Sequence, residues 1–121
     1  MIRTLATLMF VGASMMLSAQ HRDIIVTDSD AMRANARKHT ELVDRTVGLT
    51  AEQTTQVNEL YMQVERQVDG MNQRMDMAGM SEADKKAEMA PQWAVLEQMV
   101  ANKLDQILTP EQRQKWLEAT K

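Results

Sequence analysis

The sequence contains no cysteine, and this absence excludes several kinds of chemistry. A chain without thiols forms no disulfide bonds, has no thiolate nucleophile and offers no attachment point for the lipid of a lipoprotein. Aromatic residues are also scarce, at 3% of the 121 residues. Because a small chain buries proportionally little surface, the fold must gain its stability from the packing of Met, Val, Leu and Ala side chains.

Glycine and proline are scarce too, with four and two copies, and this scarcity favours continuous helices. The composition is instead rich in Ala, Gln, Glu, Met and Lys, which are strong helix formers. No stretch shows the alternation of apolar and polar residues that predicts a β-strand. The sequence therefore predicts an all-α protein, with residues 28–121 forming a single helical domain.

The chain also lacks an excess of basic residues, because 14 Lys and Arg stand against 17 Asp and Glu. The basic residues are scattered among acidic ones and form no stripe that could follow a phosphate backbone, so nucleic acid is not an expected partner. Only two histidines occur, and the carboxylates are spread as surface partners such as Glu41 with Arg45. These features predict a protein that is not an enzyme and needs no cofactor.

A long apolar run is confined to the N-terminus, where Arg3 precedes the stretch from Leu5 to Leu17. Small residues follow it, and this order is typical of a secretory signal peptide. The run is shorter than the roughly 20 apolar residues of a membrane-spanning helix, and polar or small residues interrupt it. We therefore expect residues 1–19 to be removed near Ala19 and the mature protein to be periplasmic, with no insertion into the membrane.

The mature sequence is expected to begin with an extended or mobile arm at residues 20–27. A first helix should begin between Asp28 and Asp30, where short polar side chains can cap it, and should end at Gly48. Its inner side should carry His39 as a hydrogen-bonded core residue. The apolar residues of the same side are Met32, Ala36, Val43 and Val47.

The second and third expected helices each carry a long apolar seam with spacings of three and four residues. The second helix should run from Thr50 to about Met77, with the seam Val57, Tyr61, Val64, Val68, Met71 and Met75. After a break at Gly79, Ser81 should cap the third, with the seam Met89, Trp93, Leu96, Val100, Leu104 and Ile107. The two seams predict an antiparallel hairpin. Pro91 lies within the third pattern, so this helix should be kinked at Pro91 or begin there.

A short motif occurs twice, as LTAEQ at 49–53 and as LTPEQ at 108–112, and each copy begins an expected helix. In each copy the threonine can cap the helix, and the glutamine three residues later can reach back to the backbone of that threonine. Pro110 occupies the first helical position, where proline is tolerated. The motif residues are therefore expected to be structural: Leu49, Thr50, Gln53, Leu108, Thr109, Pro110 and Gln112.

The paired motifs resemble those of the Spy/CpxP-like LTxxQ family of periplasmic proteins, and the segment KLDQILTPEQRQKWLEATK at 103–121 is especially similar to the family's C-terminal motif. The resemblance implies a four-helix protomer with a long antiparallel helical hairpin, and an antiparallel, cradle-like homodimer. It implies an ATP-independent holding chaperone or envelope-stress protein that binds unfolded or partner proteins. The alternative that it implies is a metal-responsive protein for copper or zinc, acting as a binding or sensor-adaptor protein.

Methionine is abundant, with 12 copies, and five of them cluster around the expected hairpin turn: Met71, Met75, Met77, Met80 and Met89. Flexible thioether side chains suit surfaces that accept many apolar partners, which makes these five the candidates for client binding. Ordinary core packing is the alternative for Met71, Met75 and Met89, because these three lie on the seams. Met77 and Met80 flank Gly79 and are expected to be exposed.

No metal site is predicted, although a few side chains are weak candidates for one. Thioethers bind Cu(I), and a turn that carries Met75, Met77 and Met80 could bring three sulfur atoms close together. His21 lies near the expected new N-terminus. If cleavage left it in third position, its ring and the terminal amine could bind Cu(II). The metal-responsive alternative therefore stays open at this stage.

Overall fold

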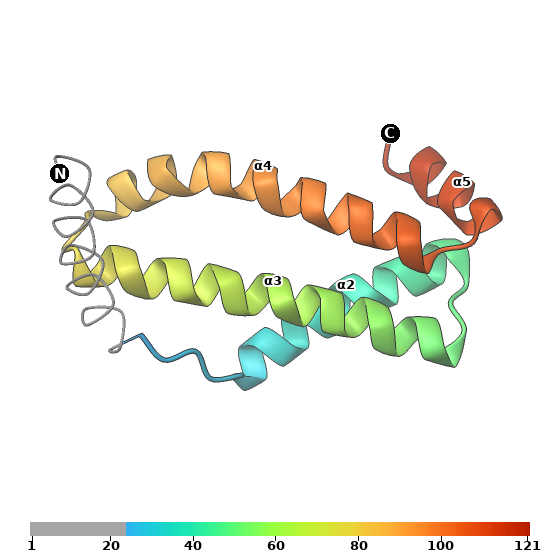
Figure 1. The fold of residues 1–121 in the computed structure, drawn as a ribbon, viewed down its shortest axis with the longest axis horizontal. Coiled ribbons are helices and arrows are strands. Elements are labelled where there is room, and N and C mark those ends of the chain that lie inside the picture. The colour runs from blue at the N-terminus through green and yellow to red at the C-terminus, as the bar shows by residue number, and fades with distance from the viewer. Residues whose placement is uncertain (1–23) are drawn as a thin grey trace, which may run out of the picture.

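The computed structural model describes residues 24–121. The expected signal peptide, its cleavage near Ala19 and the candidate ligand His21 lie outside these residues. Within them the chain is all-helical, as predicted, and forms α2 (Asp30–Val47), α3 (Ala51–Met77), α4 (Glu82–Ile107) and α5 (Pro110–Ala119) (Figure 1). No helix in residues 24–121 combines the length and the apolar character needed to cross a membrane.

Each helix begins at a polar side chain that caps it, as the sequence predicts. The Oγ of Ser29 accepts a hydrogen bond from the backbone N–H of Met32 at 3.1 Å, and Ser81 does the same for Asp84 at 3.2 Å. Thr50 and Thr109 cap α3 and α5. At the other end of α2 the chain turns at Gly48, whose φ of 72° favours glycine. These local contacts explain why the predicted helix boundaries agree with the structure.

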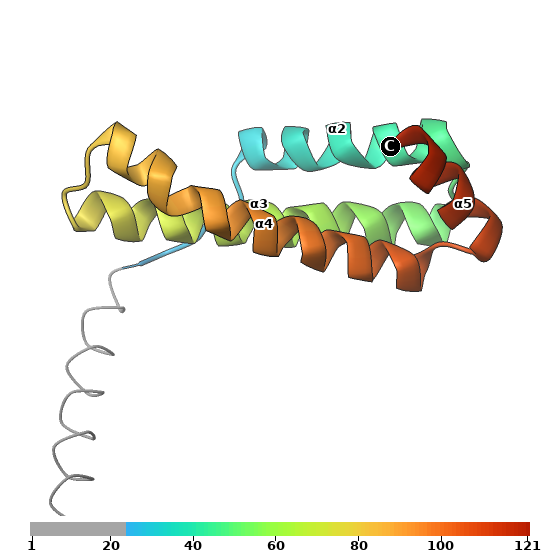
Figure 2. The same ribbon diagram turned by 90° about the horizontal axis from the view of Figure 1, so that it is seen from above.

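The helix α3 is central, because α2 and α4 both pack against it while α5 packs against α2. The chain reverses direction between α2 and α3 and again between α3 and α4, so each of these pairs is antiparallel (Figure 1). Seen from above, α4 crosses over α3 along a curved path, and α2 lies along the other side of α3 (Figure 2). The antiparallel hairpin of α3 and α4 therefore forms as predicted, with α2 as a third layer.

The core is concentrated where the ends of α2 and α4 meet the beginning of α3. One cluster of buried side chains consists of Val43, Val47, Val57, Leu60, Leu104 and Leu108. A smaller cluster joins α2 to the middle of α3 and consists of Met32, Ala36 and Met62. All four apolar residues predicted for the inner side of α2 are buried. Leu60 and Met62 lie off the predicted seam, and they are buried because α3 packs against helices on two sides.

Pro91 lies inside α4 and does not begin it, because the helix is continuous from Glu82 to Ile107. The proline is exposed. The carbonyl groups that lose a backbone hydrogen bond near an exposed proline can turn towards water, so the helix bends instead of ending. Figure 2 shows α4 curving over α3.

Residues 24–29 have no regular secondary structure and lie against α3 of the same chain. The side-chain amide of Gln73 holds the backbone of Ile25: its Nε2 donates to the Ile25 carbonyl at 2.6 Å, and its Oε1 accepts from the Ile25 N–H at 3.4 Å. Val26 packs over Gly70, where a Cβ atom would lie 3.6 Å from the Val26 Cγ2. The described part of the predicted arm is therefore docked on its own chain.

An ion pair holds the C-terminal end of this arm against α3. Arg66 donates to both carboxylate oxygens of Asp28 at 2.9 Å and to Glu59 at 2.8 Å. The hydrogen bond from Arg66 lowers the pKa of Asp28, and the two carboxylates raise the pKa of Arg66. A lowered carboxylate pKa means that this contact stabilises the fold at neutral pH and is lost as the pH falls through that pKa.

Candidate functional site

An open groove runs over α3 between α2 and α4, with a volume of about 310 Å³. We call it the aromatic groove, and its lining residues are His39, Tyr61, Val64, Glu65, Trp93, Leu96, Glu97 and Val100. Leu96 is 3% exposed, whereas the Trp93 side chain beside it is 44% exposed. A large aromatic side chain exposed next to buried apolar residues is a common feature of surfaces that bind other molecules.

A pair of stacked rings forms the α2 side of the groove. The rings of His39 and Tyr61 have centroids 4.8 Å apart and planes inclined by 17°. Burial raises the pKa of the Tyr61 hydroxyl above its ordinary value. The prediction for His39 was wrong, because its side chain is exposed and the buried position on this turn belongs to Thr40. Ala36, residue 40 and Val43 are spaced by about one helical turn each and share the buried side of α2. Residue 39 lies at the edge of that side.

Two carboxylates line the same groove. Glu65 follows Tyr61 by one helical turn on α3, and Glu97 follows Trp93 by one turn on α4. Glu65 is half-buried and Glu97 is exposed. Within residues 24–121, neither of them forms an ion pair. The groove therefore combines aromatic rings and apolar side chains with two carboxylates that form no ion pair within these residues.

A second hollow adjoins the groove towards the hairpin turn, with a volume of about 740 Å³. Trp93 lines both hollows, so they meet at this side chain. Here the charges are balanced, because Lys85 pairs with Asp76 and with Glu82, the latter at 3.0 Å. Hydrogen bonds to Asp76 and then Glu82 raise the pKa of Lys85. The two hollows thus differ in charge although Trp93 lines both of them.

The five methionines of the hairpin turn differ in exposure. Met75 and Met89 are buried, at 6% and 7% exposure, and belong to the packing between α3 and α4. Met71 and Met80 are half-buried, and Met77 is 56% exposed. In a single copy of the chain, Met77 is therefore the member of this set that is most available to a client, while Met75 and Met89 match the packing alternative.

The candidate thioether ligands have different environments, since Met75 is buried, Met77 exposed and Met80 intermediate. Within residues 24–121, no group of three or more His, Cys, Asp or Glu side chains is arranged to hold a metal ion. The structure therefore brings together no ready-made ligand set of these residue types in that part of the chain.

The two LTxxQ motifs meet and bind each other. The Nε2 of Gln53 donates to the Oε1 of Gln112 at 2.8 Å, and the Nε2 of Gln112 donates back to the Oε1 of Gln53 at 3.0 Å. Each amide also donates across the molecule, Gln53 to the carbonyl of Ile107 at 3.0 Å and Gln112 to that of Gly48 at 2.6 Å. We call this arrangement the glutamine pair, and it joins the two helix starts directly.

Each glutamine completes the cap of its own helix as well. The Oε1 of Gln53 accepts from the backbone N–H of Thr50, and the Oε1 of Gln112 from that of Thr109, both at 2.9 Å. Pro110 occupies the first turn of α5. Of the two leucines of the motifs, Leu49 is half-buried and packs against the main core cluster, and Leu108 is a buried member of that cluster. The motif residues are thus placed as folding elements, and their side chains are largely used within the protein.

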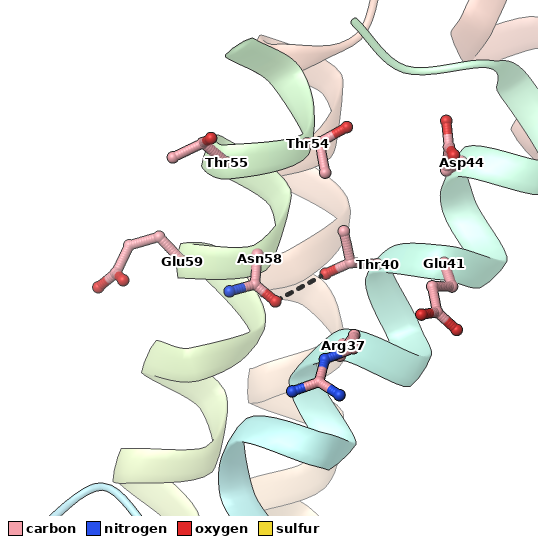
Figure 3. A pocket seen from close by; sticks show the side chains of 8 residues that line it. All are labelled: Arg37, Thr40, Glu41, Asp44, Thr54, Thr55, Asn58 and Glu59. Carbon is pink, nitrogen blue, oxygen red and sulfur yellow. Dashed lines mark hydrogen bonds between the residues drawn. The ribbon is translucent and has the colours of Figure 1, made fainter. Parts of the chain in front are cut away.

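A polar hollow of about 570 Å³ lies elsewhere between α2 and α3 (Figure 3). Thr40 and Asn58 meet there through a hydrogen bond of 3.3 Å. Figure 3 shows that Glu41 and Glu59 project to opposite sides and do not approach one another. Carboxylates that share a proton lie about 3 Å apart, so Glu41 and Glu59 do not form a pair of that kind.

Comparisons with known proteins were made at three levels. No family model, curated protein or solved structure matched the chain. Its function is therefore inferred from the motifs of the sequence and the geometry of the structure.

The sequence pointed to several groove residues for a different reason. Tyr61, Val64, Trp93, Leu96 and Val100 were predicted as seam residues that another helix would cover. Helix α4 leaves part of this seam uncovered instead, because these five residues line the aromatic groove. Glu65 and Glu97 were not predicted as site residues. The signal that could have found them is an acidic residue one turn after an aromatic residue on both seams.

Proposed function

We propose that this chain is an ATP-independent periplasmic holding protein, similar to the Spy/CpxP-like chaperones and envelope-stress proteins, which binds unfolded or partner proteins on its helical surface. The observation that supports this function best is the aromatic groove, in which a 44% exposed Trp93 adjoins buried Leu96. Apolar segments of an unfolded protein would lose water on entering the groove, and this burial favours their binding.

Other exposed apolar side chains extend the available surface. Met77, Val95 and Leu117 are all more than half exposed, and they lie on the hairpin turn, on α4 and on α5. Scattered apolar groups of this kind can contact clients of different sequence, because none of them requires one fixed partner geometry. The same exposed groups support our proposal that two copies associate, since a small chain with a thin core gains stability by sharing apolar surface.

The test is aggregation of an unfolded model client in metal-free buffer without nucleotide, followed by light scattering. We expect the protein at equimolar concentration to slow the aggregation, and Trp93→Ala to lose most of this effect. Leu42→Ala is the matched control, because Leu42 is an exposed apolar residue of α2 outside the aromatic groove. Circular dichroism of both variants would verify that they remain folded. Client aggregation that proceeds unchanged in the presence of the wild-type protein would contradict the proposed function.

The metal-responsive alternative gives a different result in the same system. If Cu(I) or Zn²⁺ were the physiological ligand, adding the ion would change the melting temperature or the sedimentation coefficient, because a ligand that binds the folded state stabilises it. We expect neither quantity to change, since the candidate thioethers of Met75, Met77 and Met80 differ in exposure.

A further inference from the structure

We infer that the aromatic groove selects basic segments of its protein partners, in which Lys or Arg lies beside apolar residues. This inference rests on the proposed function, because it assumes that the groove binds polypeptide. It goes beyond that function by stating which part of a client enters the groove and which side chains recognise it.

The aromatic groove carries two carboxylates that have no ion-pair partner within residues 24–121. Glu65 and Glu97 line it from α3 and α4. Glu65 is half-buried, so it has already lost part of its hydration. A cationic group that enters between these carboxylates would gain attraction while replacing lost hydration.

The walls of the groove also carry aromatic side chains. Trp93 exposes 44% of its surface, and the stacked rings of His39 and Tyr61 form the opposite wall. The face of an indole or phenol ring attracts Lys and Arg through its quadrupole. The aliphatic stems of the same side chains pack well on apolar groups such as Leu96. Both parts of a basic side chain therefore find matching partners in one groove.

The neighbouring hollow at the hairpin turn provides an internal comparison. Its acidic residues Asp76 and Glu82 are already paired with Lys85, so a cation that entered there would have to displace an existing partner. The selection for positive charge should therefore act at Glu65 and Glu97. A second copy of this chain is a poorer match for the groove, because the chain has a net charge of −3.

The experiment uses fluorescence of Trp93 in a Trp116→Phe background, which leaves Trp93 as the single tryptophan of a chain that has two. The probes are a synthetic peptide of Lys, Ser and Leu and an analogue in which Glu replaces every Lys. We expect the lysine peptide to shift the Trp93 emission and to bind at least about tenfold more tightly than the glutamate peptide. Its affinity should fall as salt is added, because salt screens exposed charges.

The decisive variant is Glu65→Gln combined with Glu97→Gln, which keeps the shape of both side chains and removes their charge. We expect this variant to bind the lysine peptide about three- to tenfold more weakly, because it loses two partly exposed charge contacts. The matched control, Glu41→Gln with Glu118→Gln, removes the same amount of charge away from the groove and should leave the affinity within about twofold.

The inference is overturned if both peptides bind equally well, or if the Glu65 and Glu97 variant behaves like its control. It is also overturned if no peptide shifts the emission of Trp93, whatever oligomeric state sedimentation reports. The aggregation assay separates these results from failure of the proposed function. A protein that suppresses aggregation equally for basic and acidic clients would still be a holding protein, but without this selectivity.

Discussion

The two ends of the helical hairpin are built differently. At one end, which we call the motif end, residues 49–53 and 108–112 meet beside the main core cluster, and the side chains of Val43, Val57 and Leu104 are fully buried. At the other end, the hairpin tip around Gly79, the buried apolar side chains are Met75 and Met89. The motif end has branched aliphatic side chains with few rotamers, whereas the tip has flexible thioethers.

Hydrogen bonding follows the same division. At the motif end the glutamine pair connects segments that are 59 residues apart in the sequence, and the same glutamines complete the capping boxes of α3 and α5. At the tip, Lys85 and its two carboxylates provide partly exposed charge contacts, which contribute little to stability. Regions with few buried contacts open at low cost in free energy. The comparison teaches that the motif end maintains the fold, while the tip is held by flexible side chains and partly exposed charge contacts.

The largest expected effect is the loss of a core side chain at the motif end. Leu104→Ala should lower the free energy of unfolding by about 2–5 kcal/mol, because Leu104 is 2% exposed and its removal leaves a cavity. Met77→Ala at the tip should change it by less than about 0.5 kcal/mol. Urea denaturation followed by circular dichroism measures both. Equal losses in the two variants would abolish the distinction between the two ends.

The next effect tests the glutamine pair. Gln53→Ala should destabilise the protein by about 1–3 kcal/mol, since it leaves the carbonyl of Ile107 and the amide of Gln112 with fewer partners. In a double-mutant cycle with Gln112→Ala, the two losses should be non-additive by about 0.5–3 kcal/mol. Gln56→Ala, an exposed glutamine of α3, is the control. Simple additivity would mean that the two motifs fold independently.

A smaller effect is expected for the two threonine caps. Thr50→Ala and Thr109→Ala should each lower the free energy of unfolding by about 1 kcal/mol. Replacement by Ser should keep most of this stability, because a serine hydroxyl also caps a helix. Client binding should change only as far as stability does. Loss of binding at unchanged melting temperature would identify the motifs as contact sites instead.

The smallest effect on stability is expected at the tip. Met77→Ser with Met80→Ser should change the free energy of unfolding by less than about 0.5 kcal/mol, while aggregation suppression in metal-free buffer should weaken. Leu42→Ser is the control for loss of an exposed apolar group elsewhere. If Cu(I) binding fell and metal-free activity stayed constant, the thioethers would be ligands. If neither property changed, the tip would be a connector.

The amino-acid sequence was sufficient to predict the local structure. The structure confirms the caps at Thr50, Ser81 and Thr109, the end of α2 at Gly48 and the burial of the four apolar residues predicted for its inner side, but not the burial of His39. These features depend on interactions within about one or two turns of a helix, so residue type and spacing are enough to specify them. The same is true of the all-α class, which follows from helix formers with little glycine or proline.

Only the tertiary structure decided which of these local elements come into contact. The hydrogen bonds between Gln53 and Gln112 join residues 59 positions apart, and the ion pair of Asp28 with Arg66 spans 38 positions. The aromatic groove likewise forms where residues of α2, α3 and α4 that are far apart in the sequence come together. Contacts of this kind depend on how whole helices cross and bend. Each one is the result of packing over many side chains, and no short stretch of sequence encodes it alone.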